Sequence, residues 1–264
     1  MPFVCAGTQR GGPKNLREET LEMSFTLYVV FHKFLVPECY ETLSGEQLNY
    51  LRFMAVNAKI PKEVPENLQR LVIAERSLGW YDPFLQHNRF CESSAFFHVW
   101  KNPELMKDYI GFFHYDMLMT KTAIDFLQEV IPSSEERLLF TNVTLTAWPQ
   151  LNQVIRIEQW NEIVAIYNGL FHTRHSIIDV LDEQLPLYHS FVAHRDIFHR
   201  MMTFAEKAIP RLFELIEYDT KHLPFMIERM HGICLVLQKR EGFTHRWIPL
   251  PGITHLDRLK DSWR

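Results

Sequence analysis

Two side chains that could share one ligand follow an apolar run near the middle of the chain. His114 comes directly after residues 109–113 (YIGFF), and Asp116 stands two positions later. Because side chains at positions i and i+2 of a strand point to the same side, both can reach one ligand beyond the strand end. Imidazole and carboxylate groups suit Mn²⁺ or Mg²⁺, and such an ion would neutralise a leaving diphosphate. A strand-end histidine before a turn-forming aspartate is also common without a ligand, so a structural role stays open.

A second candidate group is the pair Glu228 and Arg229, which interrupts an otherwise apolar helical pattern at residues 225–237. A carboxylate on a rigid helix that faces a cleft suits a general base, because the base must lie within about 3 Å of the hydroxyl it deprotonates. The alternative for Glu228 is an ion pair within the helix or on its surface.

Thirteen histidines add further candidates, of which His32, His231, His245 and His255 are the most notable. Most histidines in proteins are ordinary polar or capping residues, so type alone selects none of them.

Several well-known catalytic patterns are missing from the sequence. It contains no Gly-x-Ser-x-Gly, no Gly-x-x-x-x-Gly-Lys-Ser/Thr and no Gly-x-Gly-x-x-Gly. Their absence disfavours serine hydrolases, P-loop enzymes and dinucleotide oxidoreductases. The aromatic run with Phe96, Phe97 and Trp100 resembles a stacking platform, but packing in the core is the more common role of such a pattern.

The elements that must position these residues follow from the hydrophobic patterns. We expect strands at residues 26–31, 71–73, 109–113, 138–141, 164–171 and 246–250, and helices at 46–56, 93–100, 123–130, 204–216 and 225–237. Alternating strands and helices predict an α/β fold: an open, mainly parallel, Rossmann-like sheet flanked by helices, with a helical C-terminal third. Ligands of such sheets bind at the carboxyl ends of the strands.

Length and composition are those of an ordinary globular protein. The 264 residues fit one domain, which we place at residues 23–264. Residues 1–22 contain Gly-Gly-Pro and a charged run, so we expect a flexible leader there. The net charge of -4 argues against nucleic acid as a partner, because nucleic-acid binders usually carry a basic face.

The apolar runs and cysteines bear on the compartment. The apolar runs are shorter than the about 20 residues that cross a bilayer, and the N-terminus lacks the order of a secretion signal. We therefore expect a cytoplasmic protein without a transmembrane segment. The cysteines Cys5, Cys39, Cys91 and Cys234 are scattered, which fits neither a disulfide framework nor a zinc site.

Two segments of the chain carry recognisable motifs. Residues 88–102 (NRFCESSAFFHVWKN) contain Trp-Lys-Asn, and residues 108–115 (DYIGFFHY) contain Tyr-Ile-Gly-x-x-His-Tyr. Together they resemble the motifs of capsular-polysaccharide-type glycosyltransferases. Residues 28–33 (YVVFHK), 167–171 (YNGLF) and 227–230 (IERM) match further motifs in the same order. The Tyr-Asp-Met at residues 115–117 is similar to the motif at this place in relatives from large DNA viruses and some eukaryotes.

This resemblance implies a GT-A-like domain with a strand-end metal site and a later helix that supplies the acceptor-activating carboxylate. His114, Asp116 and Glu228 stand in that order. A histidine near the C-terminus often completes the metal site in GT-A enzymes; His245 and His255 are the candidates, and His255 is preferred. The bacterial pattern has arginine in place of Asp116, so metal binding depends on the strand-end geometry and not on the family.

The resemblance also implies residues that contact the donor. His32 and Lys33 follow the first strand, where lysine can offer charge to phosphate. Tyr115 and Arg229 belong to the matched motifs. Asn88 and Glu92 match as well, and for these two a donor contact and helix capping remain open.

The sequence therefore predicts a metal-dependent glycosyltransferase. It would move xylose, galactose or glucose from a UDP-sugar to a hydroxyl of a glycan, with Mn²⁺ or Mg²⁺ on Asp116, His114 and His255. Glu228 would act as base in an inverting displacement. One alternative is a retaining transferase on the same fold, and another is a non-catalytic module that binds nucleotide sugars.

Overall fold

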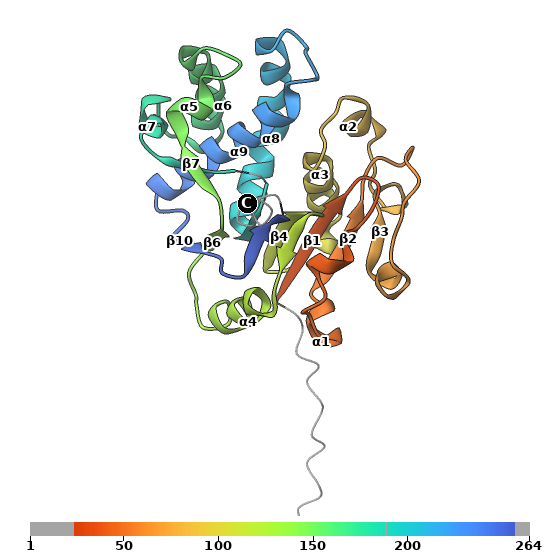
Figure 1. Cartoon of the computed structure of the whole chain (residues 1–264). Coiled ribbons are helices and arrows are strands. Elements are labelled where there is room, and N and C mark those ends of the chain that lie inside the picture. The colour runs from red at the N-terminus through yellow and green to blue at the C-terminus, as the bar shows by residue number, and fades with distance from the viewer. Residues whose placement is uncertain (1–23, 188, 257–264) are drawn as a thin grey trace, which may run out of the picture.

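The computed structural model describes residues 24–187 and 189–256, in which one central sheet lies between helices (Figure 1). Within these residues the sheet has seven strands in the order β10-β6-β9-β4-β1-β2-β3. Their bounds are β1 (Phe25–Phe31), β2 (Leu51–Ala55), β3 (Val72–Ala74), β4 (Tyr109–His114), β6 (Leu138–Thr141), β9 (Phe191–His194) and β10 (Arg246–Pro249).

The sheet is mostly parallel, with one exception at its centre. β1 is parallel to β2 and β4, and β10 is parallel to β6. β9 runs antiparallel to both of its neighbours, β4 and β6. The start of β9 therefore lies at the same edge as the carboxyl ends of the parallel strands, since Phe191 pairs with Phe112. Residues before β9 join the edge at which ligands of such sheets bind.

Helices cover both faces of the sheet. They are α1 (Gly45–Leu48), α2 (Pro83–His87), α3 (Ser93–Lys101), α4 (Lys121–Val130), α5 (Ala147–Leu151), α6 (Trp160–Phe171), α7 (Ile178–Leu181), α8 (Arg195–Leu215) and α9 (Leu223–Arg240). Short 3-10 helices are η1 (Pro37–Cys39), η2 (Glu66–Leu71), η3 (Glu75–Ser77), η4 (Pro103–Leu105) and η5 (Ile157–Gln159). No helix in the described part of the chain is long and apolar enough to cross a membrane.

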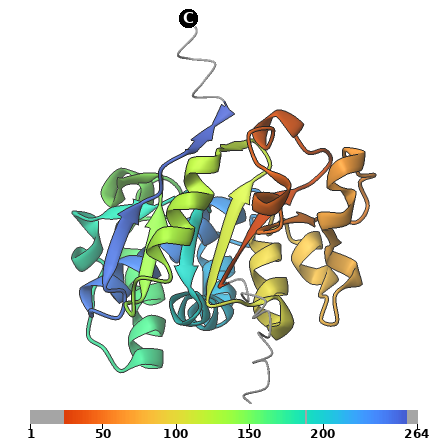
Figure 2. The same cartoon turned by 90° about the horizontal axis from the view of Figure 1, so that it is seen from below.

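Two hydrophobic cores lie between the sheet and the helices that cover its two faces. The larger core joins one face of the sheet to α3, α6, α8 and α9. The smaller core joins the other face to α4 and η1, and Figure 2 views the molecule from that side, with α4 in front of the strands. The buried Ala123, Ile124 and Leu127 of α4 have the spacing of one helix face. Apolar residues on both faces explain why the strands are nearly continuous hydrophobic runs.

Two small strand pairs lie outside the main sheet. β5 (Met117–Met119) pairs antiparallel with β11 (Ile253–His255), so the C-terminal strand reaches the turn after β4. β7 (Thr144–Thr146) pairs antiparallel with β8 (Gln184–Pro186). Gly252, with φ of +73°, makes the turn before β11, where glycine is the residue without a steric penalty.

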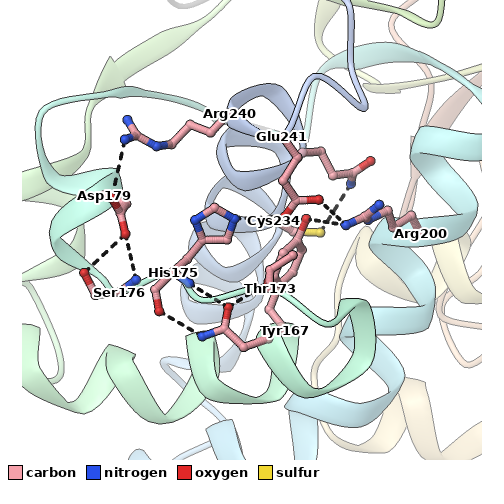
Figure 3. A network of polar contacts seen from close by, with 11 residues as sticks. Tyr167, Thr173, His175, Ser176, Asp179, Arg200, Cys234, Arg240 and Glu241 are labelled. Carbon is pink, nitrogen blue, oxygen red and sulfur yellow. Dashed lines mark hydrogen bonds and ion pairs between the residues drawn. The ribbon is translucent and has the colours of Figure 1, made fainter.

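A polar cluster fixes the far end of α9 (Figure 3). Glu241, which follows α9, pairs with Arg200 of α8 and lies 3.0 Å from Nε2 of His175. Nη2 of Arg200 also donates to the hydroxyl of Tyr167 in α6 at 3.1 Å. The cluster ties α6, α8 and α9 together away from the carboxyl edge of the sheet, and so it holds in place the helix that carries Glu228 at its other end.

Most expected elements are present, and two are wrong. The expected strands at 26–31, 71–73, 109–113, 138–141 and 246–250 and the helices at 93–100, 123–130, 204–216 and 225–237 are confirmed within one or a few residues, except that α8 starts earlier. The expected helix at 46–56 is the short α1 followed by β2. Residues of β2 pack in both hydrophobic cores, Met54 in one and Leu51, Phe53 and Ala55 in the other, so its pattern resembles a helix segment.

The expected strand at 164–171 is part of α6. Trp160, Ile163, Val164 and Tyr167 are buried at helical spacing, which an eight-residue window at 164–171 does not reveal. The strand β9 was not expected. The aromatic run in α3 packs in the core as predicted, since Phe96 and Phe97 are buried. The expected leader at 1–22 lies outside the described residues.

Candidate functional site

The carboxyl ends of β1 and β4 and the start of β9 bring together residues that are distant in the sequence. β1 and β4 are in register with Val30 beside His114, so His32, directly after β1, lies near the end of β4. His189 precedes the antiparallel β9 and reaches the same edge. Glu92 precedes α3, and its carboxylate oxygen Oε1 lies 3.3 Å from Nε2 of His32.

A cavity of about 280 Å³ opens at this edge. Five of its lining residues carry charged or imidazole groups: Glu92, His114, His189, Glu228 and Arg229. Other lining residues are apolar and include Leu145, Leu187, Pro224 and Phe225. Small-molecule sites usually occupy about 300–1,000 Å³, so this cavity suits a compact group such as one sugar ring and not a whole nucleotide sugar.

Glu92 is a partly buried carboxylate that lines the cavity. Burial alone would raise the pKa of Glu92, but the hydrogen bond with His32 and the nearby imidazole of His114 outweigh it and bring the pKa to about 2. Although Glu92 precedes α3, its side chain makes no capping hydrogen bond. Of the two expectations for Glu92, the geometry therefore favours a ligand contact over helix capping.

Two other expected donor contacts lie elsewhere. Nδ2 of Asn88 donates to the carbonyl of Phe84 at 3.0 Å, so Asn88 caps the end of α2. Lys33 is 60% exposed, and its Nζ lies 3.6 Å from Oε1 of Glu63. Neither residue lines the cavity.

The pair Asp116 and His255 forms a second part of the site. β4 ends at His114, the chain turns at Tyr115 and Asp116, and the pairing of β5 with β11 brings His255 alongside. Nε2 of His255 lies 3.2 Å from Oδ2 of Asp116. The other oxygen, Oδ1, is buried and has no hydrogen-bond partner among the described residues. An oxygen left in this way is suited to a cation.

The other candidate histidine for this position is far away. His245 accepts a hydrogen bond from the backbone N–H of Arg137 at 2.9 Å, before β6 and at the opposite edge of the sheet. The structure thus brings His255, and not His245, to Asp116.

His114 lies with the cavity group. Its Nε2 is buried without a hydrogen-bond partner among the described residues, and it lines the cavity with Glu92 and His189. Asp116 belongs to the turn and not to β4, so the strand alternation that would align it with His114 does not apply. Among residues 24–187 and 189–256 no group of three or more His, Cys, Asp or Glu side chains is placed to hold a metal ion. Of the three expected ligands, Asp116 and His255 lie next to each other, and His114 lines the cavity.

Glu228 and Arg229 differ in role although they are neighbours. Glu228 lines the cavity, with 15% of its side chain exposed and Oε2 3.6 Å from Nη1 of Arg229. Nε of Arg229 donates to the carbonyl of Gln150 at 2.6 Å, and Nη2 donates to Gln153. Arg229 therefore holds α5 and the residues after it against α9, and it forms part of the cavity wall.

Tyr115 supports the turn that carries Asp116. Its ring packs edge-on against Phe34, with 5.4 Å between the ring centroids. Its carbonyl accepts a hydrogen bond from the hydroxyl of Tyr40 at 3.2 Å. These contacts hold the turn in place.

Sequence reasoning missed His189. It noted the buried neighbour His231, whose Nδ1 lies 3.3 Å from Nε2 of His189, among the histidines but without a role. The short β-prone run FVAH at 191–194 was the available signal, because a strand there places the preceding residues at the edge of the sheet.

Comparisons with known proteins concern the fold. No protein-family model matches the sequence, and no curated protein matches it. Among solved structures, the bifunctional glycosyltransferase WbbM in its apo form is similar, with a TM-score of 0.59, 15% sequence identity and coverage of 86% of this chain. The chain spans less than half, 45%, of that WbbM chain. Core-mannan synthase A from Aspergillus fumigatus in its Mn/GDP form has a TM-score of 0.35 and 8% identity, over 87% of this chain and 76% of that one. The chain therefore adopts a GT-A-like α/β fold, a mostly parallel sheet between helices, which it shares with WbbM.

Proposed function

We propose that the protein is a glycosyltransferase that moves a sugar from a UDP-sugar to a hydroxyl of a glycan. The observation that carries the proposal is a sugar-sized cavity with two carboxylates, Glu92 and Glu228, at the carboxyl edge of the sheet. Ligands of open α/β sheets bind at that edge. The shared fold with WbbM supports the same reading.

The pair Asp116 and His255 would hold Mn²⁺ or Mg²⁺. The buried Oδ1 of Asp116, which has no hydrogen-bond partner among the described residues, and the imidazole of His255, 3.2 Å from Oδ2, are groups that suit a divalent cation. When bound, the ion supplies neutralising charge to the leaving diphosphate. His32, at the end of β1, would lie near the same phosphates.

Glu228 would act as the base. A carboxylate with a pKa of about 2, as in Glu92, accepts a proton poorly, because general-base efficiency follows basicity. Glu92 is instead suited to accept hydrogen bonds from sugar hydroxyls. Glu228 would take the proton of the acceptor hydroxyl while that oxygen attacks the anomeric carbon and the diphosphate leaves, which inverts the anomeric centre.

The acceptor would approach over Phe225. This ring lines the cavity and is 55% exposed. An exposed aromatic face beside polar groups is a common lining for a site that takes an amphipathic ring such as a sugar. Xylose, galactose and glucose remain the candidate donor sugars.

The test is a transfer assay with a panel of UDP-sugars, Mn²⁺ and glycan acceptors, with the anomeric configuration of the product measured by NMR. We expect transfer with inversion. Retention would assign Glu228 a positioning role only. Thermal stabilisation by a UDP-sugar without its consumption would identify a non-catalytic binding module. A protein that shows no stabilisation and no transfer with any UDP-sugar would contradict the proposal.

A further inference from the structure

Two buried histidines lie against each other behind the cavity. Nε2 of His189 and Nδ1 of His231 are 3.3 Å apart, and the two residues are 7% and 2% exposed. The ring of His231 stacks on Phe96 at 5.6 Å between centroids, and the ring of His189 meets Phe96 edge-on at 4.9 Å. Both imidazoles are therefore held in fixed orientations.

The close approach of α9 to β8 sets this pair. A Cβ at Gly232, next to His231, would lie 3.2 Å from Cβ of Leu185, so the helix packs directly on the strand that precedes His189. His189 itself has φ of +45°, a left-handed conformation that is uncommon for a residue with a side chain. Such strain persists where the surrounding structure imposes it, and it is common at ligand sites.

Only one ring proton can lie between the two nitrogens. Burial lowers the pKa of His189 to about 3 and the pKa of His231 well below its ordinary value, so both rings are neutral near pH 7. Nε2 of His231 is buried without a hydrogen-bond partner among the described residues. A buried N–H without an acceptor is rarer than a buried lone pair without a donor. The proton of His231 therefore belongs on Nδ1, which donates to Nε2 of His189.

This arrangement determines the tautomer of His189. With Nε2 accepting, the proton of His189 is on Nδ1, the nitrogen that His231 does not use. His189 lines the cavity together with Glu92 and Glu228. Because Nε2 faces His231, Nδ1 is the nitrogen left for the cavity. There it would offer a neutral N–H donor near the carboxylate of Glu92, and one hydroxyl group could accept from the first and donate to the second.

We propose that His189 is a sugar-binding residue, which donates a hydrogen bond from Nδ1 to a hydroxyl of the sugar that is transferred, and that His231 is a positioning residue that fixes its tautomer. This proposal rests on the proposed function. It identifies the sugar as the part of the donor that the cavity recognises. It concerns the sugar and not the nucleotide, because the volume of about 280 Å³ suits one ring.

The test compares the binding of UDP and of UDP-sugars by isothermal titration calorimetry in the presence of Mn²⁺, for the wild type and the variants His189→Phe, His231→Phe and His231→Asn. We expect UDP to bind all four proteins alike. The gain in affinity from the sugar should fall by about tenfold in His189→Phe, because the sugar hydroxyl loses the hydrogen bond that Nδ1 donates to it.

His231 separates positioning from structural support. His231→Phe keeps the stack on Phe96 but removes the donor to His189, so the gain from the sugar should fall by a few-fold. The amide of His231→Asn can donate to the same nitrogen, and we expect it to restore part of the gain. An equal loss in both variants would overturn the positioning role.

A spectroscopic measurement on the wild type does not depend on the variants folding. Long-range ¹H–¹⁵N spectra of the imidazoles should show both rings protonated on Nδ1, and the Nδ1–H of His189 should shift on addition of a UDP-sugar but not of UDP. Protonation of His189 on Nε2, or an unchanged sugar gain in a folded His189→Phe, overturns this proposal alone. A wild type that binds neither UDP nor any UDP-sugar overturns the proposed function and this proposal together.

Discussion

The imidazole of His255 lies 3.2 Å from the carboxylate of Asp116, although more than half of the chain separates them in sequence. The contact exists because β11 pairs with β5, with His255 opposite Met117. The backbone N–H of Leu256 also donates to the carbonyl of Asp116 at 3.1 Å. The last described strand is thereby part of the proposed metal site.

Replacing Asp116 should remove metal-dependent donor binding while the fold is retained. We expect Asp116→Asn to lower the affinity for Mn²⁺ in the presence of UDP by more than about tenfold, because the variant loses the anionic ligand. Thermal shift with UDP, with and without Mn²⁺, measures this effect. His245→Gln is the matched control, since His245 lies at the opposite edge, and it should behave as the wild type. An Asp116→Asn protein with the wild-type metal response would exclude the proposed site.

Replacing Gly252 should disturb the same site from a distance. A Cβ at this position would lie 2.4 Å from Oγ1 of Thr120 and 2.9 Å from the backbone nitrogen of Ala123, so Gly252→Ala must shift β11. We expect a loss of about 1 kcal/mol or more in the free energy of unfolding, and a weaker thermal response to Mn²⁺ with UDP.

Gly242→Ala is the control for backbone strain. Gly242 has a similar φ of +69°, but nothing lies within 4 Å of an added Cβ. It should lose stability without losing the metal response. If Gly242→Ala impairs the metal response as much as Gly252→Ala does, the docking of β11 is not what positions His255.

Replacing Glu228 should slow the chemical step and spare donor binding. We expect Glu228→Gln to lower kcat by about 10²–10⁴-fold, the usual contribution of a general base, with an affinity for UDP-sugar close to that of the wild type. Single-turnover transfer and calorimetry measure the two quantities. Glu214→Gln is a control on the exposed surface of α8. Transfer at the wild-type rate by Glu228→Gln would remove Glu228 as the base.

The buried pair Glu75 and His98 should contribute strongly to stability. Nε2 of His98 accepts from the backbone N–H of Asp82 at 3.1 Å, so its proton is on Nδ1, 2.5 Å from Oε1 of Glu75. We expect Glu75→Ala to lower the free energy of unfolding by about 1–3 kcal/mol for each buried donor that loses its acceptor. Glu206→Ala breaks the exposed pair with Lys101 and should cost less than about 1 kcal/mol, as urea unfolding can measure.

The same pair predicts a dependence on pH. Burial alone would raise the pKa of Glu75, but hydrogen bonds with His98, Ser94 and Gln86 outweigh it and lower the pKa below its ordinary 4.5. A lowered pKa stabilises the folded state above the ordinary value, and this stabilisation is lost as the pH falls below 4.5 toward the pKa of the folded state. The stability difference between wild type and Glu75→Gln should therefore shrink between about pH 7 and about pH 3. A constant difference would contradict the assignment.

The amino-acid sequence determined the elements whose pattern is local. The apolar run before His114 predicts β4, and the helical spacing at 225–237 predicts α9 with Glu228 on it; both are confirmed. The alternation of such runs also predicts the α/β class. These predictions succeeded because periodicity is a property of neighbouring residues, which the chain carries without its tertiary contacts.

Tertiary structure decided the elements and contacts that depend on distant pairing. A strand such as β2, whose residues pack in both hydrophobic cores, has no clear alternation that separates it from a helix segment. The short β9 is stable because β4 and β6 pair with it on either side, and its antiparallel direction is what brings His189 to the cavity. The choice of His255 over His245 likewise follows from the pairing of β11 with β5. The sequence supplies the groups of the candidate site, and long-range strand pairing determines which of them meet.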